Sequence, residues 1–324
     1  MLKLFFTISY VMLAPFVGAF ADSMPKGRVM LYSNFIKVAG CLLMFSTFHP
    51  LLAYAVVGFG AAAYSPAKYG ILTELLPPEK LVAANGWIEG TTVSSIILGA
   101  VVGGALISET VSAFLLQFDL PMIDTGVNSP AESALVVIAI IYVVAAAINL
   151  KIPDTGARYP RQLRHPIKLI KAFARANIIL WSDKLGQISL SITTLFWGAG
   201  ATLQFIVLDW ARESLDMPLS QAALLQGIVA VGVAVGAVAA AKFITLKRSL
   251  RVLPFGVALG LVIPAMTMVE STAIAYPLLV IVGGLAGYFV VPMNALLQHR
   301  GYVRLSAGHS IAVQNFNENL NILV

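Results

Sequence analysis

Three ionisable residues, Lys37, Lys68 and Glu89, lie within stretches of sequence that otherwise carry almost no charge. Charged side chains in apolar surroundings are costly, and they are usually retained where they bind a charged ligand or one another. A lysine ammonium group binds an anion such as a phosphate, and a glutamate carboxylate binds a cation such as an amine. We therefore take all three as candidate ligand-binding residues. For Lys68 and Glu89 the alternative is a structural ion pair, and for Lys37 it is a side chain that reaches to the membrane surface.

Amide side chains form a second candidate group. Asn85 lies one helical turn before Glu89, Gln204 follows the glycine-rich stretch 198–200, Asn294 follows a proline, and Gln314 opens the last apolar run. We expect these four residues to line a ligand cavity. Close helix packing and buried amide networks between helices are the alternatives. The polar or aromatic neighbours that share these expectations are Trp197, Thr202, Gln298, Asn315, Asn317 and Glu318.

The sequence lacks the residue patterns of an enzyme or a metal site. The four histidines are not spaced as metal ligands, and there is no phosphate-binding glycine loop or nucleophile motif. The single cysteine, Cys41, excludes a disulfide scaffold and is expected to be an apolar core residue. We expect no catalysis and no cofactor.

Composition indicates where the chain resides. Of its 324 residues, 59% are hydrophobic and 11% are charged, against about 45–50% and 25% in soluble domains. The mean hydropathy of +0.87 agrees. Such a chain has too little polar surface to face water, so we predict an all-α polytopic membrane protein.

A membrane-spanning helix needs about 20 mostly apolar residues. Nine such runs and the beginning of a tenth are present. They cover residues 3–21, 30–48, 51–70, 84–108, 133–151, 186–210, 220–246, 253–269, 274–298 and 308–324.

Basic residues predict the orientation of these spans. If the first run ends in the cytosol, 17 of the 21 lysines and arginines lie on the cytosolic side, and only Lys3 and Arg212 lie outside. This bias is typical of membrane proteins. The basic pI of about 9.4 therefore reflects topology and contact with anionic lipid, and it gives no reason to expect nucleic acid as a partner.

The chain divides into two halves around a basic segment. Residues 1–151 form one expected helical bundle and residues 186–324 a second, joined by a cytosolic linker at 152–185 that is either amphipathic or simply solvated. The halves are weak repeats, since Pro66 and Pro292 follow similar glycine-rich runs. Aligning the repeats leaves the first half one helix short and the second incomplete. We therefore expect a fragment of a twelve-helix protein.

The loop after the first run resembles a motif of the major facilitator superfamily. It places Gly18 four residues before Asp22 and follows with the basic residues Lys26 and Arg28 around a glycine. A carboxylate at a helix end can bind both a basic side chain and the N-terminus of a neighbouring helix. We expect these four residues to form a latch that breaks when the two bundles rock.

A longer series of motifs resembles the bacterial lysophospholipid transporter family. In chain order these are APFVG at 14–18, AAAYSPAKYGIL at 61–72, ANG at 84–86, FWGAGATL at 196–203, VVPMNALLQ at 290–298 and IAVQN at 311–315. Two features depart from the family. Its first helix with an acidic Phe-Gly-Asp-Asn stretch is absent, and Gln204 stands where some members carry arginine.

The resemblance implies a secondary transporter of the bacterial inner membrane that flips lysophosphatidylethanolamine and lysophosphatidylglycerol for reacylation. For such a substrate, the ligand-binding interpretation of the two ionisable residues places Lys68 on the lipid phosphate and Glu89 on an ethanolamine ammonium, with the structural ion pair as the alternative. The resemblance also implies a partner, an acyltransferase coupled to acyl-carrier-protein synthetase. The alternatives are an exporter of drugs or metabolites with the same fold, and a membrane scaffold for a lipid-remodelling enzyme.

Overall fold

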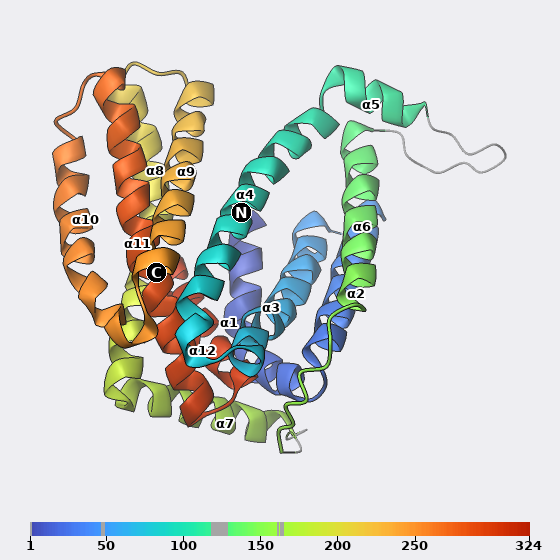
Figure 1. Cartoon of the computed structure of the whole chain (residues 1–324). Helices are drawn as coiled ribbons and strands as arrows, with labels where there is room; N and C mark the ends of the chain where they lie inside the picture. Colours follow the sequence, from blue (N-terminus) through green and yellow to red (C-terminus); the bar gives the residue numbers. More distant parts are fainter. Residues whose placement is uncertain (1, 47–48, 118–128, 161, 163–164) are drawn as a thin grey trace.

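A computed structural model describes residues 2–46, 49–117, 129–160, 162 and 165–324 of the chain, and every regular element in these ranges is helical (Figure 1). The prediction of an all-α fold is confirmed. Nine helical segments in the described residues are long and apolar enough to cross a membrane, one for each complete run predicted above. Residues 118–128, between the fourth and fifth predicted spans, and the linker residues Arg161, Leu163 and Arg164 lie outside the described residues.

The first half contains six helices, of which α5 is a short segment outside the predicted spans. They are α1 (Leu2–Asp22), α2 (Lys26–Phe45), α3 (Pro50–Leu75), α4 (Leu81–Leu106), α5 (Glu109–Leu116) and α6 (Pro130–Asn149). The second half begins with a long helix and ends with the short tenth run. Its helices are α8 (Lys184–Ser214), α9 (Leu219–Phe243), α10 (Leu253–Met266), α11 (Thr272–Arg304) and α12 (Ala307–Leu323). Two 3-10 segments, Pro78–Lys80 and Leu246–Val252, precede α4 and α10.

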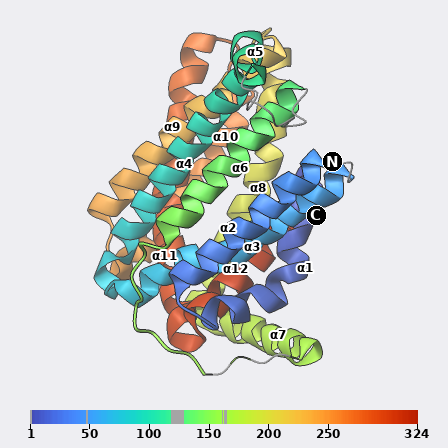
Figure 2. The same cartoon turned by 90° about the vertical axis from the view of Figure 1, so that its right-hand side faces the viewer.

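Helix α7 (Pro166–Ser182) connects the halves and lies across one end of the molecule (Figures 1 and 2). Its Phe173 is buried together with Ala176 and Leu180, in a core cluster that includes residues of both halves. Ile167 and Ile170 are exposed instead. Part of the segment 152–185 is therefore helical, and the apolar residues of this helix are divided between the protein core and the outer surface.

The two halves meet at the end that carries α7 and diverge towards the opposite end (Figure 1). Two helix pairs make most of this contact, α1 with α12 and α4 with α9. In the first pair, a Cβ atom on Gly18 would lie 3.0 Å from the Cα atom of His309. In the second, a Cβ atom on Gly86 would lie 2.8 Å from the carbonyl oxygen of Ala237. Small residues thus allow the helices of opposite halves to approach closely.

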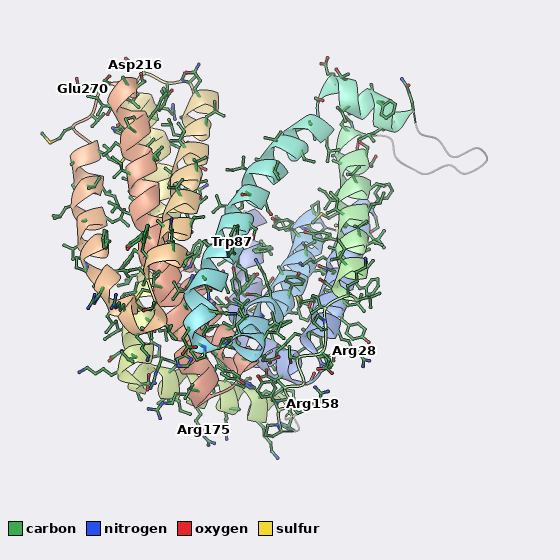
Figure 3. All side chains as sticks on the ribbon, viewed as in Figure 1. Arg28, Trp87, Arg158, Arg175, Asp216 and Glu270 are labelled. Atoms are coloured by element: carbon green, nitrogen blue, oxygen red, sulfur yellow. The ribbon has the colours of Figure 1, made fainter. Side chains whose placement is uncertain are left out.

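Charged residues separate between the two ends of the molecule. Arg28, Arg158 and Arg175 lie at the end where the halves meet, whereas Asp216 and Glu270 lie at the other end (Figure 3). By the positive-inside rule the closed end faces the cytosol.

Candidate functional site

A cavity of about 250 Å³ lies between the two halves. The first half contributes side chains from α1, α3 and α4, and the second half from α8, α11 and α12. The lining side chains are Phe6, Tyr10, Ser65, Tyr69, Glu89, Trp197, Asn294, Gln298, Ile311, Gln314, Asn315, Glu318, Asn319 and Ile322.

Two buried carboxylates line this cavity, one from each half. Glu318 of α12 accepts a hydrogen bond from Nε2 of Gln314 at 2.8 Å, and the side chain of Thr193 also hydrogen bonds to it. Glu89 of α4 makes no hydrogen bond or ion pair within the part of the chain that the structure describes, although it is only 7% exposed. No lysine, arginine or histidine is among the lining residues. The two acidic side chains of the cavity therefore have no basic side chain beside them in its described lining.

Amide side chains connect these acids to the rest of the wall. Nε2 of Gln314 also donates to Oδ1 of Asn294 at 3.0 Å, and Nδ2 of Asn315 donates to Oγ of Ser65 at 2.8 Å across the two halves. The Oε1 atom of Gln314 is buried and has no hydrogen-bond partner. Of the residues singled out from the sequence, seven are in the described lining, namely Glu89, Trp197, Asn294, Gln298, Gln314, Asn315 and Glu318, whereas Thr202 and Asn317 are not.

Asn85 holds the two halves together directly. Its Nδ2 donates to Oε1 of Gln298 at 2.8 Å, and Nε2 of Gln298 donates back to Oδ1 of Asn85 at 2.9 Å. Both residues are almost fully buried. Because separating such a pair leaves buried amides without partners, it costs free energy to break. Asn85 is thus a contact between the halves, next to the cavity rather than in its described lining.

Lys68 and Lys37 lie outside the described lining of the cavity. Nζ of Lys68 donates to Oγ1 of Thr92 at 3.2 Å, and Nζ of Lys37 lies 4.2 Å from the ring centroid of Tyr64. The ion pair considered for Lys68 and Glu89 is not formed within the described residues, although their opposite charges still interact. Both lysine side chains are half-buried, and neither is fully exposed at the surface of the protein.

Gln204 also lies away from this cavity. Its Nε2 donates to Oε1 of Gln226 at 2.8 Å, which links α8 to α9 inside the second half. This contact accounts for its polar side chain as an amide pair between neighbouring helices.

Asp22 lies at the N-terminus of α12, in the opposite half. Its Oδ1 accepts a hydrogen bond from the backbone amide of Gly308 at 2.9 Å, and its Oδ2 accepts one from Oγ of Ser306. Nδ1 of His309 lies 2.9 Å from the same Oδ2. A carboxylate is well placed at a helix N-terminus because the free amides and the helix dipole both favour negative charge.

Lys26 completes the contact on the side of the first half. Its Nζ lies 2.8 Å from Oδ1 of Asp22 and 3.2 Å from Oε1 of Glu74, and all three side chains are buried. Gly18 permits the close approach of α12 described above. Arg28 is exposed at the same end and makes no ion pair with Asp22 in the described structure. The role of these four residues as a latch stays a prediction.

The linker takes part in this cluster, which the sequence did not predict. The Tyr159 hydroxyl donates to Oε1 of Glu74 at 2.7 Å, and Oγ1 of Thr155 donates to Oε2 of Glu74 at 2.7 Å. The Tyr159 hydroxyl also hydrogen bonds to the backbone of Ala307. Burial, followed by the bond to Glu74, raises the pKa of Tyr159. We call Asp22, Lys26, Glu74, Tyr159 and Ser306 the cytosolic gate.

A second charged cluster joins the linker to α11. Asp183 caps α8 by accepting a hydrogen bond from the amide of Gly186 at 2.9 Å. Arg300 forms two hydrogen bonds with its carboxylate, and Nε of Arg304 donates a third at 3.0 Å. The guanidinium of Arg300 holds the pKa of Asp183 well below its usual range.

Two helical bundles that enclose a polar cavity within the membrane, and meet at a charged gate, define a transporter. The chain belongs to the Major Facilitator Superfamily, whose family model matches residues 2–320. The predicted family and fold are confirmed.

Similar proteins within the superfamily carry more specific names. The lysophospholipid transporter LplT of Yersinia enterocolitica is 43% identical over 324 residues, covering 100% of this chain and 75% of that protein. The lysophospholipid transporter LplT of Serratia proteamaculans is also 43% identical, covering 100% of this chain and 76% of its own.

Solved structures share the fold at low sequence identity. The transporter FucP in its outward conformation is 14% identical with a TM-score of 0.71, and the match covers 99% of this chain and 80% of FucP. The human organic anion transporter MFSD10 is 16% identical with a TM-score of 0.70, covering 99% of this chain and 76% of MFSD10.

Proposed function

We propose that this chain moves lysophospholipids between the two leaflets of the bacterial inner membrane, chiefly those with ethanolamine or glycerol head groups. Its support is that proteins 43% identical to it over its full length are named lysophospholipid transporters. The nine candidate spans and the superfamily membership agree with a multi-pass membrane protein.

The single observation that carries the proposal is the polar cavity between the halves. Carboxylates and amides from both halves line it, so a polar head group within it would contact both halves at once. Asp22 and the Asn85–Gln298 pair join the same two halves near the cytosol. Breaking those contacts would open the cavity to the cytosolic side, as alternating access requires.

The size of the cavity fits part of a lipid. Pockets for drug-sized ligands measure about 300–1,000 Å³, and this cavity measures about 250 Å³. A head group would occupy it, while the single acyl chain stays among apolar side chains or lipid. The amide nitrogen of Asn294 and the hydroxyl groups of Tyr10 and Tyr69 supply donors for phosphate oxygens. The free Oε1 atom of Gln314 supplies an acceptor for a head-group donor such as an ammonium group.

In this proposal Lys68 makes no direct contact with the head group, unlike in the phosphate-binding role considered from the sequence. Because its ammonium group is bonded to Thr92 outside the described lining, contact with a phosphate would require it to leave that partner. We propose that Lys68 and Lys37 influence the electrostatic potential in the cavity from positions outside its described lining. The proposed cellular partner is an acyltransferase coupled to acyl-carrier-protein synthetase, which would reacylate the delivered lipid.

Transport of labelled lipids tests the proposal. The chain is reconstituted into vesicles with fluorescent lysophosphatidylethanolamine or lysophosphatidylglycerol, and dithionite quenches the label in the outer leaflet only. We expect complete quenching with the wild-type chain and about tenfold slower flipping with Asn294→Ala and Gln314→Ala combined, since each loses a head-group contact. Gln221→Ala, an exposed amide on α9, is the matched control. Flipping no faster than in protein-free vesicles would overturn the proposal.

A further inference from the structure

Helix α7 contacts both halves of the protein through one of its faces. Phe173, Ala176 and Leu180 are buried in a core cluster that also contains Ala14 of α1 and Ala312 of α12. Because α1 belongs to the first half and α12 to the second, α7 joins the two halves from the outside, next to the cytosolic gate.

Polar and aromatic contacts also tie α7 to α12. Nε1 of Trp181 donates to Oδ1 of Asn317 at 3.2 Å, and Nδ2 of Asn317 donates to Oδ1 of Asn177 at 2.9 Å. The rings of Phe173 and Phe316 meet edge to face, with their centroids 5.2 Å apart. A change in the position of α7 therefore acts directly on α12, whose first turn is part of the cytosolic gate.

These contacts lie on the sides of α1 and α12, away from the tips of both helices. Ala14 precedes Asp22, the last residue of α1, by eight residues, and Asn317 follows Ala307, the first residue of α12, by ten. At about 1.5 Å per residue the contacts lie about 12 and 15 Å from the cytosolic helix ends. Because a helix with its side chains is about 10 Å across, the outer side of α7 lies near those ends, at the level of the lipid head groups.

The outer face of α7 carries two neighbouring rows of exposed side chains. The apolar row consists of Ile167, Ile170, Ala174 and Ile178. The basic row consists of Lys168, Lys171 and Arg175. Residues three and four positions apart share one face of a helix, so each row is continuous. The rows adjoin because each basic residue directly follows an apolar one in the sequence.

The two rows together have the chemistry of a helix that lies on an anionic membrane. Helix α7 contains no acidic residue, and its three basic side chains form no ion pair with any part of the chain that the structure describes. Ile167 and Ile178 are 59% and 64% exposed, which is unfavourable in water but favourable among acyl chains. Unpaired positive charge beside exposed apolar side chains is the pattern of interfacial helices.

We propose that the outer face of α7 binds the anionic phospholipids of the inner leaflet, and that this binding keeps the two halves together at the cytosolic end. The isoleucines would insert at the boundary between head groups and acyl chains, and the basic side chains would extend to the phosphates. The inference goes beyond the proposed function, because the ligand is the surrounding two-chain lipid and not the transported one.

The attachment of α7 to both halves explains why lipid binding would act on the gate. Separation of the halves moves α1 away from α12, so α7 must lose its contacts with one of them. Ligands that bind one conformation better than the other shift the equilibrium towards it. A lipid surface that fits α7 in its present position therefore stabilises the conformation in which the cytosolic end is closed.

Hydrogen exchange of the purified full chain in lipid nanodiscs tests the binding. One set of discs contains phosphatidylcholine alone, and the other contains phosphatidylcholine mixed with phosphatidylglycerol. We expect the backbone amides of α7 to exchange about tenfold more slowly in the anionic discs, since each basic residue near the surface adds to the attraction. The difference should disappear at high salt, because the Debye length falls to about 3 Å at 1 M.

Charge variants decide whether the effect arises at this face. The triple variant Lys168→Gln/Lys171→Gln/Arg175→Gln should lose the effect of phosphatidylglycerol, and the exposure of all three side chains leaves the packing of α7 intact. The triple variant Lys247→Gln/Arg248→Gln/Arg251→Gln makes the same change in net charge on the exposed 3-10 segment before α10 and should keep the effect. Lys168→Arg/Lys171→Arg should also keep it.

Two results would overturn the lipid site. One is equal exchange of α7 in the two kinds of disc, whether fast, as for a solvated linker, or slow, as for a helix held by its isoleucines alone. The other is an effect of phosphatidylglycerol that persists in the Lys168, Lys171 and Arg175 variant.

A cysteine tests the link to the gate separately. Ala312→Cys in a Cys41→Ala background should react more slowly with a thiol reagent in the anionic discs, since Ala312 is buried between α12, α1 and α7. Equal reaction in the two kinds of disc would overturn the link to the gate. Lipid flipping that persists in the α7 variant would leave the proposed function standing.

Discussion

The hydroxyl of Tyr159 donates a hydrogen bond to the carboxylate of Glu74 at 2.7 Å, although 85 residues separate them in the chain. Tyr159 belongs to the linker and Glu74 to the end of α3 in the first half, and the same hydroxyl hydrogen bonds to the backbone of Ala307 at the start of α12. One linker side chain therefore contacts both halves at the cytosolic gate.

Loss of the Tyr159 hydroxyl should weaken the closed gate. Hydrogen bonds to charged groups contribute about 1.5–3 kcal/mol, and the side chain of Glu74 is 1% exposed, so water does not replace the donor easily. We expect Tyr159→Phe to lower the unfolding temperature of the purified chain. Tyr302→Phe, on a more exposed tyrosine of the cytosolic end of α11, is the control. Equal unfolding temperatures for the two variants would contradict a role of the hydroxyl.

Removal of the Asp22 charge should open the cytosolic end. Asp22→Asn weakens the bonds to Gly308, Ser306 and Lys26 together, and breaking a buried ion pair costs about 3–5 kcal/mol. We expect faster reaction of a cysteine placed at Ala312, which is buried against α1, in a Cys41→Ala background.

The matched control for that experiment is Asp154→Asn. Asp154 pairs with Arg158 on the exposed linker, where ion pairs contribute little. Reaction at position 312 that is no faster in Asp22→Asn than in this control would exclude Asp22 as a latch.

The ion cluster at Asp183 makes part of the stability depend on pH. Its pKa in the folded chain is lowered by Arg300, from an ordinary value of about 3.9. A lowered pKa gives stability that is present above the ordinary value and lost as the pH falls through the folded value. We expect Asp183→Asn to lose about 2–3 kcal/mol at pH 7, and the difference from wild type to shrink below about pH 4. A difference that is constant from pH 7 to pH 3 would show that the charge is not responsible.

Topology can be tested with two cysteines in the Cys41→Ala background. Ser271 precedes α11 at the end with Glu270, and Ser182 ends α7 at the basic end. The positive-inside rule predicts that an impermeant thiol reagent added to intact cells labels Ser271→Cys, and labels Ser182→Cys only after permeabilisation. The reverse pattern would invert the orientation assigned here.

The spans were predictable because their length is set by the bilayer. Each complete apolar run coincides with a helix to within a few residues, as for the run at 133–151 and α6 (Pro130–Asn149). The contact of Asp22 with a helix N-terminus was also predictable. A carboxylate at the end of one helix can accept hydrogen bonds from the free amides at the start of another.

The partners of individual side chains were less predictable. The number of residues between a loop and Lys68 or Glu89 indicates how deep each side chain lies in the membrane. It does not indicate which neighbouring helix the side chain faces, because helix packing decides that. In the structure Lys68 faces Thr92. Asn85 and Gln298 are 213 residues apart, and no local pattern relates them. The Tyr159 contact depends on the path of a linker whose described residues 153–160 form no regular secondary structure.

The backbone amides in the first turn of α12 find hydrogen-bond acceptors in three different parts of the chain. Ser306 caps His309 within its own helix, Asp22 accepts from Gly308, and Tyr159 meets Ala307. The internal cap remains when the halves part, so α12 should not fray when the gate opens. Water then needs to solvate only two freed amides, and the helix can swing away as an intact rod.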